Sequence, residues 1–286
     1  MYESRAMTSS KKIAVITTIR GEDFFLDKWI EYYGRELGRK NLYVIVDGHD
    51  EVLPDDIKDV NFIWIPHIVI PLVAFEKRRA RIISNFASML FEIFDIVIAV
   101  DVDEFIVVDP VIDSGLAEYL STIKGTSTVS GLGVDLRHNI ASEGEFDYSK
   151  PVLGQRRFAA IEAKYTKPSI AFEAVQWKSG MHRVHNKHFL IDPNLYLLHL
   201  GLFDMVYVKK HMETRGEKNP DWLEHFKRRV ALMDEVQAYP AQNAEKFFSA
   251  ARKHFKERRR LIHSNKPKAI SGNNIIEVPE RFFGVL

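Results

Sequence analysis

Cysteine is absent from this sequence of 286 residues, which excludes disulfide scaffolds, thiolate zinc sites and cysteine nucleophiles. Long apolar runs are absent too. None approaches the roughly 20 residues of a membrane-spanning helix, and the polar start lacks the apolar core of a signal peptide. Charge of one sign is not in excess, since 40 Lys and Arg stand against 39 Asp and Glu. A general nucleic-acid-binding protein would carry a large basic excess. We therefore expect a cytoplasmic protein that binds no nucleic acid.

The order of apolar segments predicts an α/β protein. Hydrophobic residues make up 46% of the chain, enough for one large α/β body over 11–215, with 216–286 as a helical extension packed on the same domain. Alternating strands and helices predict a mostly parallel, Rossmann-like sheet flanked by helices. Ligands bind such sheets beyond the carboxyl ends of the strands. The expected strands are 13–17, 42–46, 61–65 and 96–100, and the expected helices between them are 24–37 and 74–94.

An acidic turn directly follows the last of these strands. Asp101 and Asp103 form an Asp-x-Asp pair whose carboxylates lie on one side of an extended chain, and Glu104 comes next. Three acids in four residues repel one another unless a cation neutralises them. The turn therefore predicts a metal and phosphate site, and the alternative is a solvated acidic turn. An aspartate-nucleophile phosphatase is disfavoured, because its motif usually lies on the first strand and Phe105 replaces the usual Thr or Val.

Several segments follow one another in an order that is far more specific than any one of them. They are Leu26-Asp27-Lys28-Trp29-Ile30-Glu31-Tyr32-Tyr33, Val46-Asp47-Gly48-His49-Asp50, Asp101-Val102-Asp103-Glu104-Phe105, Lys167-Pro168, Trp177-Lys178-Ser179-Gly180-Met181-His182 and Leu197-Leu198-His199-Leu200-Gly201-Leu202-Phe203-Asp204. Over residues 12–210 this series resembles the family 2-like nucleotide-sugar glycosyltransferases of the GT-A fold. The chain departs from that group at 20–23, where Arg-Gly-Glu-Asp replaces the usual Asn-Glu, so the contact to the nucleotide base there stays open.

The resemblance implies a metal ion, Mn²⁺ or Mg²⁺, between the aspartates and the donor diphosphate, where it offsets charge on the leaving nucleoside diphosphate. Asp103 is the direct ligand that we expect, with Asp101 as the second contact. His182 or His199 would complete the metal site. The implied donor is a nucleotide sugar, UDP-sugar first, and the implied acceptor is a saccharide or glycolipid of a bacterial surface polymer.

Side chains at the strand ends and near the start of the second helix are candidates for the nucleotide and its phosphates. Asp47 suits a hydrogen bond to the base or ribose, or else it is only the turn aspartate before Gly48. Guanidinium groups at the start of a helix can reach a diphosphate or form a solvated face. The residues that we expect to bind the nucleotide are Thr17, Arg20, Asp47, Arg78, Arg81, Asp101 and Lys167.

An inverting transfer, which the resemblance favours, needs a group that takes the proton from the attacking hydroxyl. The catalytic set expected here is Asp103, Glu173 and His182. Spacing does not choose the base among Glu173, Asp135, Asp204 and His182. Trp177 is a candidate for contact with the sugar, whereas Trp29 and Tyr33 are expected to pack in the core.

The last part of the chain is rich in basic residues, and it could hold an anionic lipid surface at the inner face of the membrane or form a solvated helix. The basic residues of this segment are Arg252, Lys253, Lys256, Arg258, Arg259, Arg260, Lys266 and Lys268.

We expect a metal-dependent glycosyltransferase; the alternatives are a sugar nucleotidyltransferase and a catalytically silent carbohydrate-binding protein.

Overall fold

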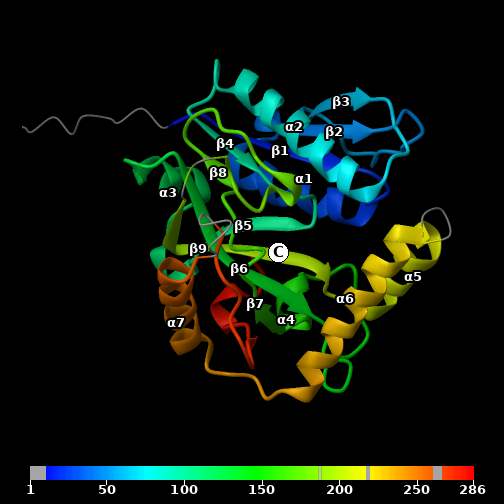
Figure 1. The fold of residues 1–286 in the computed structure, drawn as a ribbon, viewed down its shortest axis with the longest axis vertical. Helices are drawn as coiled ribbons and strands as arrows, with labels where there is room; N and C mark the ends of the chain where they lie inside the picture. Colours follow the sequence, from blue (N-terminus) through cyan, green and yellow to red (C-terminus); the bar gives the residue numbers. More distant parts are fainter. Residues whose placement is uncertain (1–10, 186, 188, 217–219, 260–265) are drawn as a thin grey trace, which may run out of the picture.

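Buried apolar segments form the strands of one large sheet in a computed structural model, which describes residues 11–185, 187, 189–216, 220–259 and 266–286 (Figure 1). The strand order is β10-β7-β6-β8-β4-β1-β2-β3, and β9 joins β6 to β5 beside this path. The protein is therefore α/β, with a sheet that is compatible with a Rossmann-like fold. The strands are β1 (Ile13–Ile19), β2 (Leu42–Asp47), β3 (Asn61–Ile65), β4 (Ile96–Ala99), β5 (Glu104–Val108), β6 (Thr128–Arg137), β7 (Phe158–Ile161), β8 (Ile170–Ala171), β9 (Leu190–Leu202) and β10 (Ile275–Glu277).

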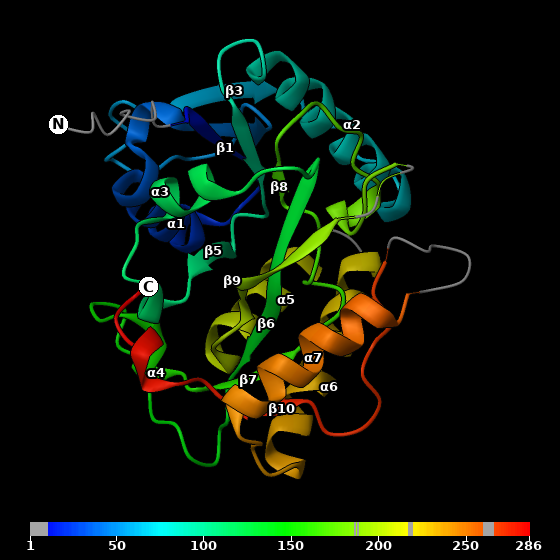
Figure 2. The ribbon, with the colours of Figure 1, turned by 90° about the vertical axis from the view of Figure 1, so that its left-hand side faces the viewer.

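The strands β3, β2, β1 and β4 are all parallel, which confirms the predicted order of strands and helices in this half. Side chains alternate between the two faces of β1. Ala14 and Ile16 pack with α2, while Ile13 and Val15 pack with α1. The two helices thus cover opposite faces, as Figure 2 shows on either side of the parallel strands. The helices of the chain are α1 (Asp23–Leu37), α2 (Leu72–Leu90), α3 (Leu116–Thr122), α4 (Val152–Gln155), α5 (Met205–Gly216), α6 (Pro220–Ala238) and α7 (Ala244–Glu257).

The other half of the sheet is mixed rather than parallel. The long strands β6 and β9 run parallel to each other, whereas β7, β8 and β10 pair antiparallel with their neighbours. The segment 216–286 is not purely helical, because β10 adds a strand to the edge of the sheet beside β7. Helix α7 packs on β9 through Phe248, whose ring lies 5.0 Å from that of Tyr196. The extension is thereby built into the sheet.

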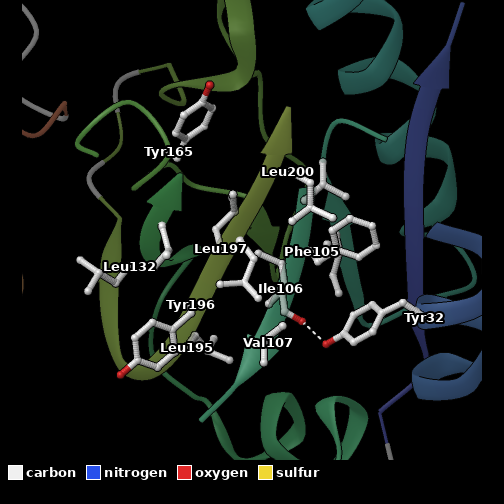
Figure 3. Packing of buried hydrophobic residues seen from close by; sticks show 14 of the residues in the cluster. Tyr32, Phe105, Ile106, Val107, Leu132, Tyr165, Leu195, Tyr196, Leu197 and Leu200 are labelled. Carbon is white, nitrogen blue, oxygen red and sulfur yellow. Dashed lines mark hydrogen bonds between the residues drawn. The ribbon is translucent and has the colours of Figure 1, made fainter. Parts of the chain in front are cut away.

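Helix α1 fixes β5, the strand that begins inside the acidic turn. The Tyr32 hydroxyl donates to the carbonyl of Ile106 at 2.6 Å (Figure 3). Tyr33 contacts the same strand through its hydroxyl, which donates to the Glu104 carbonyl at 3.2 Å and accepts from the Ile106 amide at 2.8 Å. Trp29 and Tyr33 are fully buried, which confirms the prediction that they belong to the core. The acidic turn therefore leads into a strand that two tyrosines of α1 hold by hydrogen bonds.

The basic segment is less exposed than its sequence suggested. Arg252 is buried, donates to the carbonyls of Asp192 and Leu195, and lies 4.5 Å from the centre of the Tyr196 ring. Arg259 lies over a phenylalanine ring, and Arg260 falls outside the described residues. The exposed members are Lys253, Lys256, Arg258 and Lys268. Within the described residues, no helix has the length and apolarity needed to cross a membrane.

An ion pair ties the end of the chain to the strand that follows the acidic turn. Arg281 holds the buried Asp109 carboxylate through Nε at 2.7 Å and Nη2 at 2.9 Å. Burial alone would raise the pKa of Asp109, but Arg281 outweighs it and holds the pKa below its usual value. A lowered pKa stabilises the folded state above about pH 4, and this contribution is lost as the pH falls.

Replacing Arg281 with glutamine is therefore expected to lower the free energy of unfolding by about 1–2 kcal/mol near neutral pH, and by clearly less near pH 3.5, where Asp109 gains a proton in the unfolded chain. Urea denaturation of both proteins at the two pH values measures the difference. Glu245→Gln is the matched control, because Glu245 pairs with the same arginine but its side chain is 60% exposed. An equal loss at both pH values would contradict this account.

Candidate functional site

A cavity of about 550 Å³ lies beyond the carboxyl ends of β1, β2 and β4. In the sheet, β1 lies between β2 and β4. From β1 the chain continues through β2 to β3 towards one edge of the sheet and then returns to the other side of β1 at β4, so the switch point lies between β1 and β4. Such a switch point opens a crevice that binds ligands in α/β sheets. Helix α2 forms one wall, and α5 and α6 contribute to the other. The lining includes Thr18, Arg20, Asp47, Phe75, Arg78, Arg79, Asp101, Asp103, Tyr165, Lys167, His182, His199, Tyr207 and Arg229.

The first carboxylate of the acidic turn is paired with two cations. Asp101 contacts Arg79 through one oxygen and lies 3.2 Å from the Lys167 ammonium through the other. Lys167 also lies 2.8 Å from Glu104, which is fully buried. Burial lowers the pKa of Lys167, but the two carboxylates outweigh it and leave the pKa raised. Burial raises the pKa of Glu104. The turn is thus a buried ion-pair network, with Lys167 at its centre.

The second carboxylate of the turn lies against a histidine. His199 stands on β9 between Glu104 of β5 and Asp135 of β6 in the strand register. Its Nδ1 lies 2.6 Å from the Asp135 carboxylate, and its Nε2 lies 3.2 Å from Asp103. The Tyr165 ring stacks on the imidazole at 3.8 Å. Burial favours neutral imidazole, but the two carboxylates outweigh it and raise the pKa of His199. The two carboxylates therefore favour the charged form of the ring.

Glycine at position 201 allows three polar side chains to meet. A Cβ there would lie 2.0 Å from Arg229 Nη2, 2.7 Å from Asp103 Oδ2 and 2.8 Å from His199 Cε1. Arg229 comes from α6, in the C-terminal extension, and its Nη2 lies 3.4 Å from His199 Nε2. The long chain of Arg229 can move aside, but the buried His199 ring cannot. Any side chain at this position must therefore disturb the cavity wall.

Replacing Gly201 with alanine is expected to lower the free energy of unfolding by about 1–3 kcal/mol, the usual cost of overpacking. Gly144→Ala is the control, because a Cβ at that glycine meets nothing within 4 Å, and it should stay within about 0.5 kcal/mol of the parent protein. Urea denaturation of the three proteins measures both values. Equal stability of the two variants would show that the crowding at residue 201 relaxes freely.

His182 lines the cavity as a neutral imidazole. Its Nδ1 lies 2.8 Å from the Lys164 carbonyl, to which it donates. Burial and the positive charge of Lys167 lower the pKa of His182 to about 3. Gly180, at φ 65°, precedes it, and a Cβ there would come within 2.6 Å of His182 Nε2. The local turn thus places a histidine that stays uncharged near neutral pH.

Asp47 ends β2 at the other side of the cavity. Its Oδ2 lies 2.9 Å from His67 Nδ1, while its buried Oδ1 has no hydrogen-bond partner in the part of the chain that the structure describes. Arg20 donates to the Asp47 carbonyl at 3.0 Å and pairs with Asp50. Gly48, at φ 122°, leaves room for that guanidinium. Asp47 therefore offers a free acceptor oxygen at the strand end, where sequence reasoning expected a nucleotide contact.

Four residues predicted for the site, Thr17, Arg81, Glu173 and Trp177, do not line the cavity. Thr17 is fully buried, and on β1 it alternates with Thr18, which does line the cavity. Arg81 is exposed on the outer face of α2. Glu173 pairs with Lys187 at the surface, with half of its side chain exposed. Trp177 is buried beneath α2, and its indole donates to the Pro168 carbonyl at 2.7 Å, so it offers no surface to a sugar.

Sequence reasoning missed two arginines that shape the cavity. Arg79 lies one turn before Ile83 on the sheet-facing side of α2, so helical spacing could have chosen it over Arg81. Arg229 carried no signal, because it lies 126 residues after Asp103 in the chain and reaches the turn only through the packing of α6. Asp135, which was considered only as a base, instead positions His199.

The side chains at the acidic turn do not fit the predicted Mn²⁺ or Mg²⁺ site. Among the described residues there is no group of three or more His, Asp or Glu side chains that could hold a metal ion. A divalent cation at Asp101 would lie beside Arg79 and Lys167, which repel it. The metal ion therefore stays a prediction that rests on the resemblance alone.

No family model matches the chain, and no curated protein matches it in sequence. The resemblance to family 2-like glycosyltransferases thus stays a prediction that rests on the ordered motifs.

Proposed function

We propose that this protein is a GT-A glycosyltransferase that moves a sugar from a nucleotide-diphosphate donor to a hydroxyl acceptor. The observation that carries the proposal is the cavity at the switch point, which both aspartates of the Asp-x-Asp turn line together with Asp47. Ligand sites of this architecture lie at that point. A volume of about 550 Å³ is within the range of sites for small molecules and cofactors.

The two ends of the cavity suit different parts of such a donor. Asp47 offers a buried acceptor oxygen that has no hydrogen-bond partner among the described residues. Such an oxygen suits an N–H of a base or a ribose hydroxyl, because leaving a buried acceptor unpaired costs free energy. The other end carries Arg79, Lys167 and Arg229, and guanidinium and ammonium groups suit phosphate. A nucleoside diphosphate, with UDP as the first candidate, combines both features.

In the proposed reaction, the acceptor oxygen bonds to the anomeric carbon as the bond from that carbon to the diphosphate breaks. The hydroxyl proton passes to a base, and the diphosphate leaves with the electron pair. Asp103 lines the cavity. Burial alone would raise the pKa of its carboxyl, but His199 outweighs burial and lowers the pKa, which favours the carboxylate form. Glu173 is at the surface, and Asp204 is buried against Arg156 at 2.6 Å. We therefore propose Asp103 as the group that accepts the proton.

The acceptor in this proposal is a saccharide or glycolipid, which the resemblance implies. If it is lipid-linked, the exposed basic side chains Lys253, Lys256 and Arg258 of α7 and its end would meet anionic headgroups. Arg252 would take no part, because it is folded into the protein.

The test is calorimetric titration with UDP, GDP, ADP, CDP and dTDP, followed by the corresponding sugar donors in a hydrolysis and transfer assay. Binding of one nucleoside diphosphate and release of that nucleotide from its sugar donor would support the proposal. Binding without any release or transfer would favour a silent binding protein. Failure of every nucleotide to bind, with and without Mn²⁺, would rule the proposal out.

A further inference from the structure

The charges at the acidic turn are largely matched by contacts within the protein. Arg79 and Lys167 face Asp101, and Lys167 also faces Glu104. His199 lies between Asp103 and Asp135. A metal ion usually supplies the positive charge that an Asp-x-Asp turn lacks. Here side chains already supply it, so the turn has little charge left to hold a divalent cation.

Arg229 differs from Arg79 and Lys167, which both face Asp101. It forms no ion pair with a carboxylate in the part of the chain that the structure describes, and its Nε is buried without a hydrogen-bond partner. Burial works against its charge, yet Tyr165, Asp103 and Asp135 keep its pKa raised. It is therefore a charged guanidinium in the cavity wall whose Nε–H makes no hydrogen bond among the described residues.

A guanidinium with unused donors suits a phosphate group, which accepts two parallel hydrogen bonds from it. Arg229 is also near the acidic turn, because its Nη2 occupies the space beside Gly201 that a side chain would fill, next to Asp103 Oδ2. A ligand phosphate at this position would face Arg229 from one side of the cavity. Beside Asp101, Arg79 and Lys167 already supply positive charge.

We propose that Arg229, a residue of the C-terminal extension, binds the phosphate of the ligand, and that the site takes a diphosphate without a divalent cation. This inference rests on the proposed function and deepens it. It also gives the segment 216–286 a role in the site, because α6 places Arg229 beside Asp103 in the cavity wall.

The experiment is calorimetric titration of the full chain with inorganic pyrophosphate and with the nucleoside diphosphate that binds best, first in EDTA and then in excess Mn²⁺. We expect the dissociation constants in the two conditions to agree within about threefold. Arg229→Gln should weaken both ligands at least about tenfold in EDTA, since it loses a charge-assisted contact. Arg229→Lys should recover part of that loss, because it restores the charge without the planar fork.

Lys227→Gln is the matched control, because it removes one positive charge from the same helix at an exposed position. It should bind as the parent protein does, and thermal melts should show that all variants are folded. Binding that disappears in EDTA and returns with Mn²⁺ would overturn the inference while leaving the proposed function in place. Metal-free binding that Arg229→Gln does not weaken would also overturn it. No binding of any nucleotide in either condition would remove the proposed function itself.

Discussion

Replacing Lys167 with methionine is expected to lower the free energy of unfolding by about 3–5 kcal/mol, the cost of removing one partner from a buried ion pair. The ammonium is 1% exposed and lies 2.8 Å from Glu104 and 3.2 Å from Asp101. Arg79 still faces Asp101 in the variant, but Glu104 would be left as a fully buried carboxylate without its cation. Thermal or urea denaturation measures the loss, and a melting temperature lower by roughly 6–10 °C is expected.

The pH dependence of that loss is a check on its cause. Burial raises the pKa of Glu104 even beside Lys167, so a proton on Glu104 can replace the lost ammonium at acidic pH. A raised carboxyl pKa costs stability as the pH rises above the unfolded value of about 4.3. The deficit of Lys167→Met should therefore grow from about pH 5 to neutral pH.

Two further variants complete this test. Adding Glu104→Gln to Lys167→Met should recover part of the stability, because the buried charge is gone. Lys187→Met is the control, since this surface lysine pairs with the half-exposed Glu173, and it should change the stability by less than about 0.5 kcal/mol. A deficit that does not depend on pH or on Glu104 would refute the ion-pair explanation.

The second large effect is expected at Asp103. If Asp103 accepts the proton of the acceptor hydroxyl, Asp103→Asn should lower the turnover of sugar transfer by about 10²–10⁴-fold, the contribution typical of a general base. Asparagine keeps the shape and can still accept a hydrogen bond from His199 Nε2, which lies 3.2 Å away. Folding should change less than in Lys167→Met, because Asp135 still pairs with His199, and steady-state kinetics should place the loss in kcat.

Asp113→Asn is the matched control, because it makes the same chemical change at an exposed turn outside the cavity. Its left-handed backbone, at φ 52°, is one that asparagine also adopts readily. A turnover of Asp103→Asn within about threefold of the control would exclude Asp103 as the base. The proton would then have to pass to another group of the cavity.

Much of the fold could be predicted from local patterns. The strand 61–65 was located to the residue, and the helix expected at 24–37 begins one residue earlier. The periodic spacing of apolar residues explains this success, because it marks the buried face of a segment within the sequence of that segment. The strand β10 was missed, since three residues at an edge give no periodic signal. The antiparallel pairings were missed because strand direction depends on partners far along the chain.

The sequence by itself determined the elements of the parallel half and the acidic turn at its edge, because apolar spacing and the end of a buried strand are local properties. It also determined which side chains could reach the switch point, among them Asp47, Asp101, Asp103, Lys167, His182 and His199, all of which line the cavity. Only the tertiary structure decided their charge states and partners. Arg79, Asp135 and Arg229 come from separate elements, and they decide whether the turn is an unpaired acidic cluster or a neutralised network. That choice depends on distances of a few ångströms between segments far apart in the chain, which no local pattern encodes.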